Sequence, residues 1–394
     1  MIEHNRWMLP DGVEELLPPR AAAMEQLRRE LLDHYRSRGY DMVTPPLIEY
    51  LESLLTGTGN DLDLQTFKLT DQLSGRLMGV RADITPQVAR MDAHRLGGDG
   101  VRRLCYIGTV LHTRPGGFAG SRCPHQAGAE LFGYAGVEAD LEVLDLMLQT
   151  LRISGLGEVH LDLGHVGIYR ALMKRAGLDA ELEARLFDIM QRKAVAELEA
   201  FLDEGHVSAR LRPVVRALPE LNGDHELLAQ ARKVLEPAGK EVLAGLDQVV
   251  QAVDWLKRSR PGLAVHLDLA ELHGYRYHTG LVFAAFQPGH GRAIARGGRY
   301  DHVGEVFGRA RPATGFSADL QNLLLLGDRD RAAVGGGIVA PAADDPALAE
   351  LISELRGQGE RVIRLLPDEA AGDHAPGCDR QLLKTAQGWR VEKL

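Results

Sequence analysis

The segment Arg81-Ala-Asp-Ile-Thr-Pro86 places a carboxylate and a hydroxyl two residues apart, directly before a proline. An α-ammonium group needs an anionic and a neutral acceptor within hydrogen-bonding distance, and Asp83 with Thr85 supplies both if they share one face of a strand. The same side chains could instead cap the helix that Pro86 can open. The segment is either an ammonium-binding site or a helix N-terminus, and the residues alone favour neither interpretation.

A second pair of polar residues lies in His125-Gln-Ala-Gly-Ala-Glu-Leu-Phe-Gly133. Gln126 and Glu130 are four positions apart, so in a strand both side chains point to the same face. The pair could belong to an exposed polar face of a sheet. The spacing of Gln126, Gly128 and Glu130 and the strand-like run around them favour a ligand-binding pair instead.

Aromatic and histidine side chains gather in Leu272-His-Gly-Tyr-Arg-Tyr-His-Thr-Gly-Leu-Val-Phe283. This run is either an aromatic strand that packs into the core or the wall of a pocket. Two further segments, Gly297-Gly-Arg-Tyr-Asp301 and Pro312-Ala-Thr-Gly-Phe316, contain glycines that suit turns. The sequence has no phosphate-binding P-loop, dinucleotide-binding fingerprint or nucleophile-elbow serine motif.

The elements that must position these residues alternate between strands and helices over residues 1–330. We expect a hairpin of 66–69 with 77–80, helices at 21–38, 87–96, 138–153 and from Thr314 to about 326, strands at 104–112, 126–134, 159–164, 264–269 and 277–286, and a turn at 296–301. Residues 166–258 are rich in Glu, Leu, Ala and Arg at helical spacing, which predicts a helical insertion. The predicted fold class of this core is α+β, an antiparallel sheet flanked by helices.

Residues 331–394 show a different pattern. We expect a strand at 337–340, a helix at 345–356, a strand at 360–366 and a strand-like tail at 389–394. The pattern predicts a small C-terminal α/β domain that follows the core at residues 1–330.

Composition excludes several classes of protein. The chain of 394 residues has a net charge of −9, which argues against broad electrostatic binding of nucleic acid, so tRNA is not an expected partner. Its three cysteines have no metal-ligand spacing, which predicts reduced thiols and no metal site. No apolar run is long enough to span a membrane, and the N-terminus lacks the apolar region of a secretory signal, so we expect a cytoplasmic protein.

Taken in order, these segments resemble the histidyl-tRNA synthetases, which have the class II aminoacyl-tRNA synthetase fold. Arg81–Pro86 is similar to the R-P-E-x-T segment, with Asp in place of Glu, and His125–Gly133 is similar to the end of motif 2. Leu272–Phe283 resembles a segment special to histidine enzymes, and the two glycine-containing segments resemble the approach to motif 3. The resemblance covers about residues 5–330.

The resemblance implies a site for histidine. In that family the acid and the threonine of the first segment bind the amino group, the Gln and Glu of motif 2 contact the ligand, and the tyrosines of the third segment enclose the imidazole. Aromatic rings can pack on an imidazole face while polar groups meet the ring nitrogens. The implied histidine-binding residues are Asp83, Thr85, Gln126, Glu130, Tyr275, Tyr277 and His278.

The departures from the synthetase pattern fall at the catalytic positions. The arginine that holds the ATP α-phosphate aligns with His112, the catalytic arginine of the histidine-specific segment with His273, and the motif 3 arginine with Asn322. Loss of one preorganised charge stabiliser typically costs about 100- to 1,000-fold in rate. We therefore expect no catalytic residues, no cofactor and no adenylate formation. Further departures are Arg114, Asp319 and Gln321, where the family has Glu, Gly and Glu.

One family combines a retained amino-acid pocket with lost arginines, and the chain resembles it closely at Leu161–Gly167, Gly274–Phe283 and Gly297–Asp301. It comprises the regulatory subunits of ATP phosphoribosyltransferase, the first enzyme of histidine biosynthesis. Membership would imply that the chain binds L-histidine as an effector, and that it activates and feedback-regulates short-form catalytic subunits in a hetero-octamer. Pro45-Pro46 resembles class II motif 1, which implies a dimer. The alternatives are a divergent histidyl-tRNA synthetase and a synthetase-like tRNA-binding protein.

Overall fold

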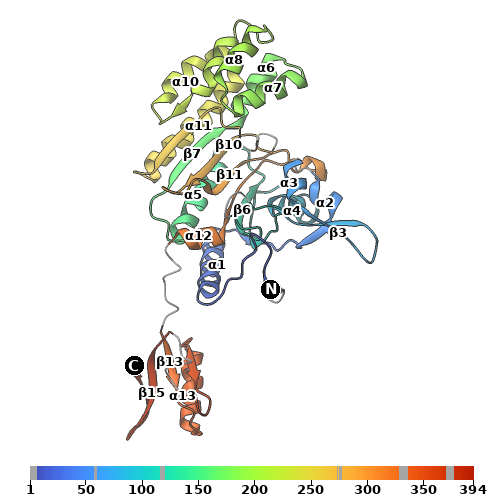
Figure 1. Cartoon of the computed structure of the whole chain (residues 1–394). Coiled ribbons are helices and arrows are strands. Elements are labelled where there is room, and N and C mark those ends of the chain that lie inside the picture. The colour runs from blue at the N-terminus through green and yellow to red at the C-terminus, as the bar shows by residue number, and fades with distance from the viewer. Residues whose placement is uncertain are drawn as a thin grey trace. The chain divides into compact units, whose positions relative to one another are not determined.

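The computed structural model describes residues 7–56, 60–115, 120–272, 274, 277–327, 336–369 and 377–394 (Figure 1). The chain divides into two compact units. The larger unit comprises Met1–Glu15 and Leu27–Gly327, and the smaller comprises Leu16–Gln26 and Asp328–Leu394. Within the described ranges, no helix is both long and apolar enough to cross a membrane.

The larger unit is organised around a nine-stranded sheet. In spatial order its strands are β1 (Asp41–Met42), β5 (Arg102–Thr109), β6 (His125–Phe132), β12 (Ala313–Asp319), β11 (Ala293–Arg299), β10 (Leu281–Phe286), β7 (His160–His165), β9 (Ala264–Asp268) and β8 (Asn222–Gly223). All neighbouring strands are antiparallel except the pairs β1–β5 and β7–β9. The predicted α+β fold class with an antiparallel sheet flanked by helices is confirmed.

On one face of this sheet, α5 (Val137–Ile153) packs against β6, β11 and β12, and the part of α1 (Arg20–Ser37) that belongs to the larger unit, from Leu27 onward, lies next to α5. The ring of Tyr35 in α1 meets the ring of Phe316 in β12 edge-on at 6.3 Å, and its hydroxyl lies 3.0 Å from Oγ1 of Thr150 in α5. The opposite face of the sheet carries Gln126 and Glu130 and is called here the site face. Other elements of the larger unit pack against it.

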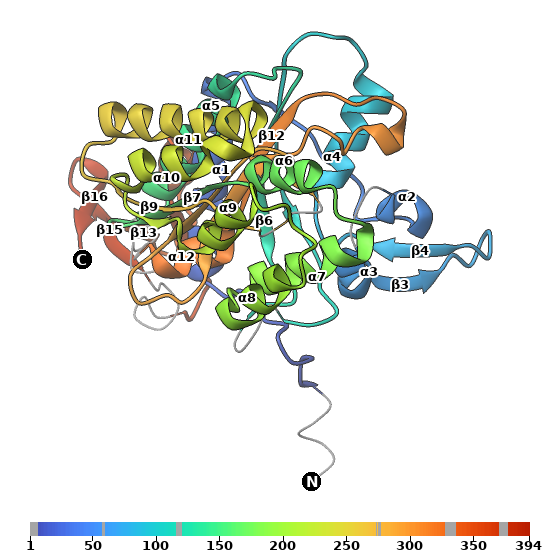
Figure 2. The same cartoon turned by 90° about the horizontal axis from the view of Figure 1, so that it is seen from above.

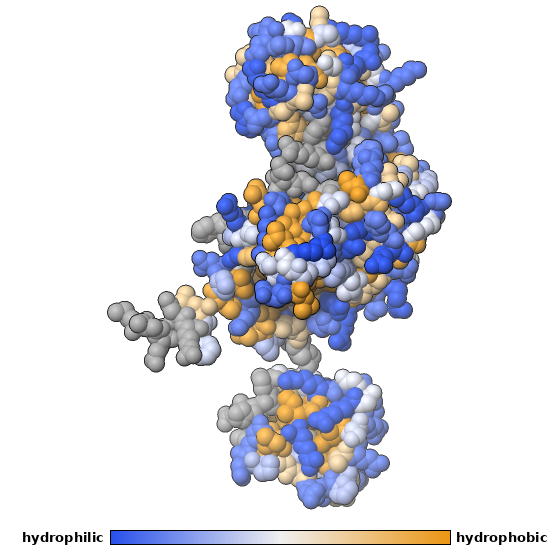
Figure 3. Space-filling model, turned by 90° about the vertical axis from the view of Figure 1, so that its right-hand side faces the viewer, coloured by the Kyte–Doolittle hydropathy of each residue, from blue (hydrophilic) through white to orange (hydrophobic). Residues whose placement is uncertain are grey.

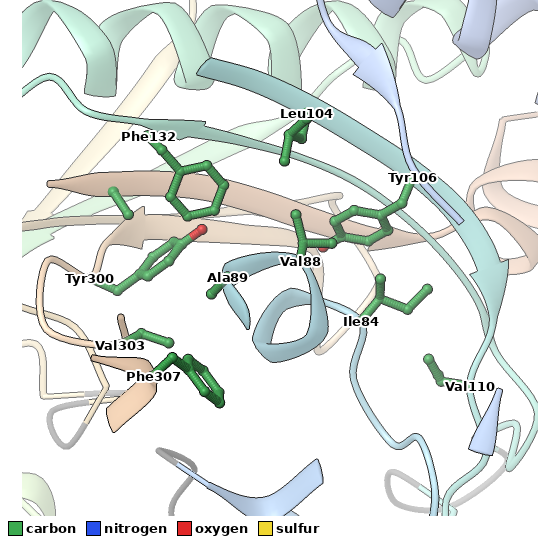
Figure 4. Packing of buried hydrophobic residues seen from close by; sticks show 11 residues of the cluster. Ile84, Val88, Ala89, Leu104, Tyr106, Val110, Phe132, Tyr300, Val303 and Phe307 are labelled. Carbon is green, nitrogen blue, oxygen red and sulfur yellow. The ribbon is translucent and has the colours of Figure 1, made fainter. Parts of the chain in front are cut away.

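On the site face, α4 (Thr85–Met91), continued by a π-helical turn at Asp92–Leu96, closes one end of the sheet. Val88 and Ala89 of α4 pack between the strands and the segment that contains Tyr300 and Phe307, and these residues belong to one buried apolar cluster (Figure 4). The cluster fixes the start of α4 against β5 and β6. Residues next to Thr85 are therefore held firmly at the sheet surface.

A small sheet precedes α4 along the chain. It consists of β2 (Ile48–Tyr50), β4 (Leu77–Val80) and β3 (Phe67–Thr70), with α2 (Leu51–Leu55) and α3 (Asn60–Gln65) in the connection. Figure 2 shows the β3–β4 hairpin at the right-hand edge of the unit. The predicted hairpin is confirmed, with Phe67 opposite Val80.

The predicted helical insertion is also confirmed. It contains α6 (Val166–Ala176), α7 (Ala180–Gln191), α8 (Val195–Asp203), α9 (Arg212–Ala217), α10 (Leu227–Leu235) and α11 (Lys240–Ser259), with short 3-10 turns at Leu218–Glu220 and Glu236–Ala238. Hydrophilic residues cover most of these helices on the side seen in Figure 3. Exposed ion pairs such as Arg185–Glu204 and Arg216–Glu199 connect residues of the insertion, while α11 packs against β7 and β10.

Three local predictions are wrong. Residues 296–301 do not form a turn, because Gly297 and Gly298 lie inside strand β11. A Cβ atom on Gly297 would stand 2.4 Å from the Gly315 carbonyl oxygen, so the glycine allows two strands and the Phe283 ring to meet closely. Residues from Thr314 continue β12 to Asp319, and helix α12 (Leu320–Leu326) begins only there. Strand β10 starts at Leu281, not at Tyr277.

The smaller unit has its own sheet and core. The strand order is β14 (Val362–Arg364), β13 (Gly337–Ala340), β15 (Cys378–Thr385) and β16 (Gly388–Lys393). Helix α13 (Pro346–Gly357) packs on this sheet through Leu348 and Ile352. The sequence patterns missed β15, which is the central partner of both β13 and β16.

Candidate functional site

Glycines hollow the site face of the large sheet. Glu130, Gly315, Gly298, Val282 and Gly164 are paired in register across β6, β12, β11, β10 and β7. A strand position without a side chain leaves a depression in the sheet surface. The row therefore forms a floor with Glu130 at one end.

A cavity of about 170 Å³ lies on this floor. Its lining includes Asp83, Thr85, Glu130, Tyr277, His278, Arg296, Tyr300, Gly315 and Ser317. Five of the predicted histidine-binding residues are thus brought together from the loop after β4, from α4 and β6, and from the segment before β10. Gln126 contacts the same group through Asp83, and Tyr275 lies outside the described residues.

Glu130 is the buried acid of this cavity, with 1% of its surface exposed. The Tyr106 hydroxyl donates to its Oε1 over 2.9 Å, and the Tyr300 hydroxyl donates to its Oε2. Burial raises the pKa of Glu130 to about 8, although both hydroxyls act to lower it. A carboxyl group with such a pKa can donate or accept a hydrogen bond near neutral pH, which matches the ring nitrogens of an imidazole.

Asp83 and Thr85 do not share a strand face, so that part of the prediction is wrong. Asp83 lies in the loop after β4, and Thr85 is the first residue of α4. The Thr85 amide donates to Oδ1 of Asp83 over 3.0 Å, and Nε2 of Gln126 donates to the same oxygen over 2.7 Å. Among the described residues Oδ2 of Asp83 accepts no hydrogen bond, so the carboxylate both supports the helix start and keeps one oxygen for a ligand.

Gln126 and Thr85 hold the residues around Asp83 in place. Oε1 of Gln126 accepts from the Ile84 amide over 2.8 Å, which fixes the side-chain amide against the loop. Oγ1 of Thr85 lies 2.9 Å from the Tyr106 hydroxyl, which in turn donates to Glu130. A continuous set of hydrogen bonds therefore connects the acceptors near Asp83 with the buried acid.

Tyr277 provides an aromatic wall. Its ring stacks on the ring of Tyr300, with centroids 5.0 Å apart and planes at 27°, and meets the ring of His278 edge-on at 5.2 Å. The buried Tyr277 hydroxyl has no hydrogen-bond partner in the part of the chain that the structure describes. Burial, and then the carboxylates of Glu130 and Asp83, raise its pKa, so the group stays a neutral donor or acceptor for a ligand.

His278 is held neutral beside this wall. Its Nδ1 lies 3.3 Å from the Arg299 carbonyl oxygen. Burial lowers the pKa of His278 to about 4, so the imidazole carries no charge near neutral pH. It therefore contributes shape and polarity to the cavity but no positive charge.

A second cavity of about 440 Å³ adjoins the first and shares Asp83, Arg296 and Ser317 with it. His112, Asp319 and Asn322, which occupy former synthetase positions, all line it, whereas His273 lies outside the described residues. Nε2 of His112 lies 2.9 Å from the Ala82 carbonyl oxygen. Asp319 accepts from the amides of His125 and Gln321, and burial raises its pKa to about 6.

The sequence patterns missed several contributors to the two cavities. Tyr106 and Tyr300 hold Glu130, and Arg292 and Arg296 line the larger cavity. Strand alternation offers one signal, because Tyr106 lies opposite Gly128 on the same face as Glu130. Among the described residues, no three metal-ligating side chains are grouped.

Comparison with protein families supports a relation over nearly the whole chain. The family described as Histidyl-tRNA synthetase matches residues 12–323, and the ATP phosphoribosyltransferase subunit HisZ C-terminal domain matches residues 335–392. The chain is 56% identical to an ATP phosphoribosyltransferase regulatory subunit from Thioalkalivibrio sulfidiphilus, with 100% of both chains covered. It is also 56% identical to the protein of the same name from Alkalilimnicola ehrlichii, covering 99% of this chain and 98% of that one.

Solved structures agree with this relation. A protein from Bacillus halodurans titled as an ATP phosphoribosyltransferase regulatory subunit/histidyl-tRNA synthetase has a TM-score of 0.80 and 25% identity, covering 93% of this chain and 94% of that chain. A histidyl-tRNA synthetase from Nostoc has a TM-score of 0.76, 16% identity and coverage of 98% and 97%. At that identity the second likeness shows a shared fold alone.

Proposed function

The chain belongs to the ATP phosphoribosyltransferase regulatory subunit family, and on that premise we propose that it binds L-histidine over Glu130 and thereby regulates a catalytic partner. The observation that carries the proposal is the buried Glu130 beside the Tyr277 hydroxyl, which has no hydrogen-bond partner among the described residues. Both groups can meet imidazole nitrogens. Asp83 and Thr85 supply acceptors for an α-ammonium group at the same cavity.

The chain regulates rather than catalyses in this proposal. Adenylate formation needs fixed cations at the α-phosphate, and His112 and Asn322 offer no guanidinium fork. Asp319 adds a carboxylate to the cavity where a polyphosphate would have to lie. These residues support the loss of the synthetase reaction, whereas the 170 Å³ cavity over Glu130, called here the amino-acid cavity, retains residues that can bind an amino acid.

Regulation requires linkage between the two subunits. Histidine changes the activity of a partner only if it binds two states of the assembly with unequal affinity. We propose that the partner is a short-form catalytic subunit, that the assembly is a hetero-octamer and that the chain dimerises. Analytical ultracentrifugation of the chain alone and with the catalytic subunit measures both assembly states.

The direct test mixes the full chain with a short-form catalytic subunit and measures phosphoribosyl transfer with and without L-histidine. We expect the chain to stimulate the reaction and histidine to inhibit the stimulated reaction. Glu130→Ala should relieve inhibition while assembly, followed by size-exclusion chromatography, is unchanged. If the Glu130→Ala variant still stimulates the reaction and histidine still inhibits it as in the wild type, then histidine does not act through Glu130.

A synthetase assay tests the alternative function. Histidine-dependent exchange between ATP and pyrophosphate should be absent from the purified chain. Clear exchange would instead support a divergent histidyl-tRNA synthetase. Co-purification of tRNA in place of a phosphoribosyltransferase subunit would support a tRNA-binding role.

A further inference from the structure

Arg296 lies near the centre of the site face, and among the described residues its side chain has no hydrogen-bond or ion-pair partner. It lies in the middle of β11, opposite Ala284 of β10 and Ser317 of β12. Its side chain is exposed although strands flank it on both sides, because both cross-strand neighbours are small. The residue lines the amino-acid cavity, the larger adjoining cavity and a third cavity of about 370 Å³ next to His278.

The contrast with Arg299 shows what a structural arginine looks like in the same strand. Arg299 is 4% exposed, pairs with Asp140, and donates to the carbonyl oxygens of Tyr134 and Gly136. Arg296, by comparison, makes no side-chain hydrogen bond or ion pair within the described ranges. Its guanidinium is therefore available to a ligand that enters the site.

Charge balance in the amino-acid cavity identifies the ligand group. The described lining contains two acids, Asp83 and Glu130, and a histidine that is neutral near pH 7. Those groups alone would hold an amine as well as an amino acid, because nothing among them compensates the α-carboxylate. Among the described residues that line this cavity, Arg296 is the one that carries a positive charge. A guanidinium group binds a carboxylate through two parallel hydrogen bonds.

We propose that Arg296 is the receptor for the α-carboxylate of the amino acid bound over Glu130. The inference rests on the proposed function, because it assigns the third anchoring point of the same site. With Asp83 at the ammonium group and Glu130 at the side chain, the three anchors distinguish an α-amino acid from an amine of the same shape.

A phosphate group is the other anion that Arg296 could meet. The larger cavity contains Arg292 as well as Arg296, but Asp83 and Asp319 also line it. Carboxylates at a nucleotide site repel the phosphates unless a metal ion lies between them. The carboxylate assignment is therefore favoured, and ATP is included in the test.

The test measures binding to the full chain by isothermal titration calorimetry, alone and with the catalytic subunit. The ligands are L-histidine and histamine, which differ in the carboxylate. Arg296→Ala should weaken histidine binding by about 10- to 100-fold and leave histamine binding unchanged. Arg296→Lys should restore part of the loss. Arg292→Ala is the matched control, because Arg292 is exposed and lines only the larger cavity of the two.

Several outcomes would overturn the assignment. They are an equal loss for histidine and histamine, no loss for either ligand, the same loss in Arg292→Ala, and a loss of ATP binding in Arg296→Ala with histidine binding intact. A melting temperature equal to that of the wild type shows that the variant folds.

Different experimental results would contradict the proposed function and the assignment of Arg296. Histidine binding that is independent of Arg296 removes the receptor assignment alone. Binding of a different L-amino acid, found in a thermal-shift panel and dependent on Arg296, removes histidine as the effector and keeps the receptor. Absence of all amino-acid binding, with and without the catalytic subunit, contradicts both.

Discussion

A Cβ atom built on Gly315 would lie 1.5 Å from Oε2 of Glu130, so this glycine leaves the space that the carboxylate occupies. The two residues face each other in register across β12 and β6. Glu130 is also hydrogen-bonded to Tyr106 and Tyr300, and it cannot turn aside without losing those bonds. The position of the acid therefore depends on the absence of a side chain on the next strand.

We predict that Gly315→Ala displaces Glu130 and lowers the affinity for L-histidine by more than about tenfold, with a stability loss of about 1–3 kcal/mol from overpacking. Calorimetry and urea unfolding measure the two effects. Gly157→Ala is the control, because a Cβ atom there meets nothing within 4 Å and the backbone is not left-handed. Wild-type affinity in Gly315→Ala would show that the ligand does not use Glu130.

The pH dependence of stability should report on Glu130. Its pKa in the folded protein is about 8 because of burial, whereas its ordinary value is 4.5. The folded state therefore holds the proton more tightly, so this stabilisation is complete below about pH 4.5 and is lost as the pH rises through 8. Glu130→Gln, which cannot ionise, should gain stability relative to the wild type over that interval, by on the order of a few kcal/mol. Urea unfolding at each pH gives the difference, and parallel profiles for the two proteins would contradict the buried acid.

Tyr277 and Tyr300 should behave differently when their hydroxyls are removed. The Tyr277 hydroxyl is buried and unpaired among the described residues, so Tyr277→Phe should leave the stability of the ligand-free protein unchanged or slightly higher. The same change should weaken histidine binding by about 3- to 10-fold, the value of one neutral hydrogen bond. Tyr300→Phe removes the bond to Glu130 and should destabilise the ligand-free protein by about 1–2 kcal/mol. Equal stability losses in the two variants would show that the Tyr277 hydroxyl already has a partner.

Local rules predicted part of the site. Gln126 and Glu130 do lie on one face, because β6 is regular over both positions and strand alternation needs no information from elsewhere. The hairpin of β3 and β4 and the insertion helices follow from local periodicity in the same way. Asp83 and Thr85 show the limit of local rules, because the structure confirms the helix-start interpretation of Asp83, whereas its role toward a ligand stays a prediction.

The missing parts depend on pairing between distant segments. Tyr300 reaches Glu130 from a position 170 residues away in sequence, and only the order of strands brings them together. The sequence predicts a turn at Gly297 and Gly298 because glycine favours turns locally, yet Gly297 allows close packing against Phe283 and Gly315, and Gly298 allows it against Leu281 and His278. Strand β15 was missed because Cys378–Thr385 is mostly polar and lacks apolar alternation.

The buried pair of Arg299 and Asp140 should be essential for the stability of the larger unit. Arg299 Nη2 lies 2.9 Å from Oδ2 of Asp140, and their side chains are 5% and 2% exposed. Removal of Arg299 leaves the buried Asp140 without its cation, and removal of Asp140 leaves Arg299 with the partly exposed Asp301 as its remaining ion-pair partner among the described residues, so Arg299→Met and Asp140→Ala should each cost about 3–5 kcal/mol. The double variant should cost less than the sum of the two single variants, because it leaves neither charge buried.

The matched control for this pair is Arg185 with Glu204 on the insertion, which are 48% and 38% exposed. Water and salt screen such a pair, and Arg185→Met should cost no more than about 1 kcal/mol. Urea unfolding of all the variants gives the comparison. If Arg299→Met proves as mild as Arg185→Met, then water reaches Asp140 in solution, and α5 does not seal the face of the sheet opposite the site. A large loss of stability confined to the buried pair would show that Arg299 and Asp140 hold strand β11 in place at Gly297 and Gly298. The position of Glu130 on the opposite face of the sheet depends on this support.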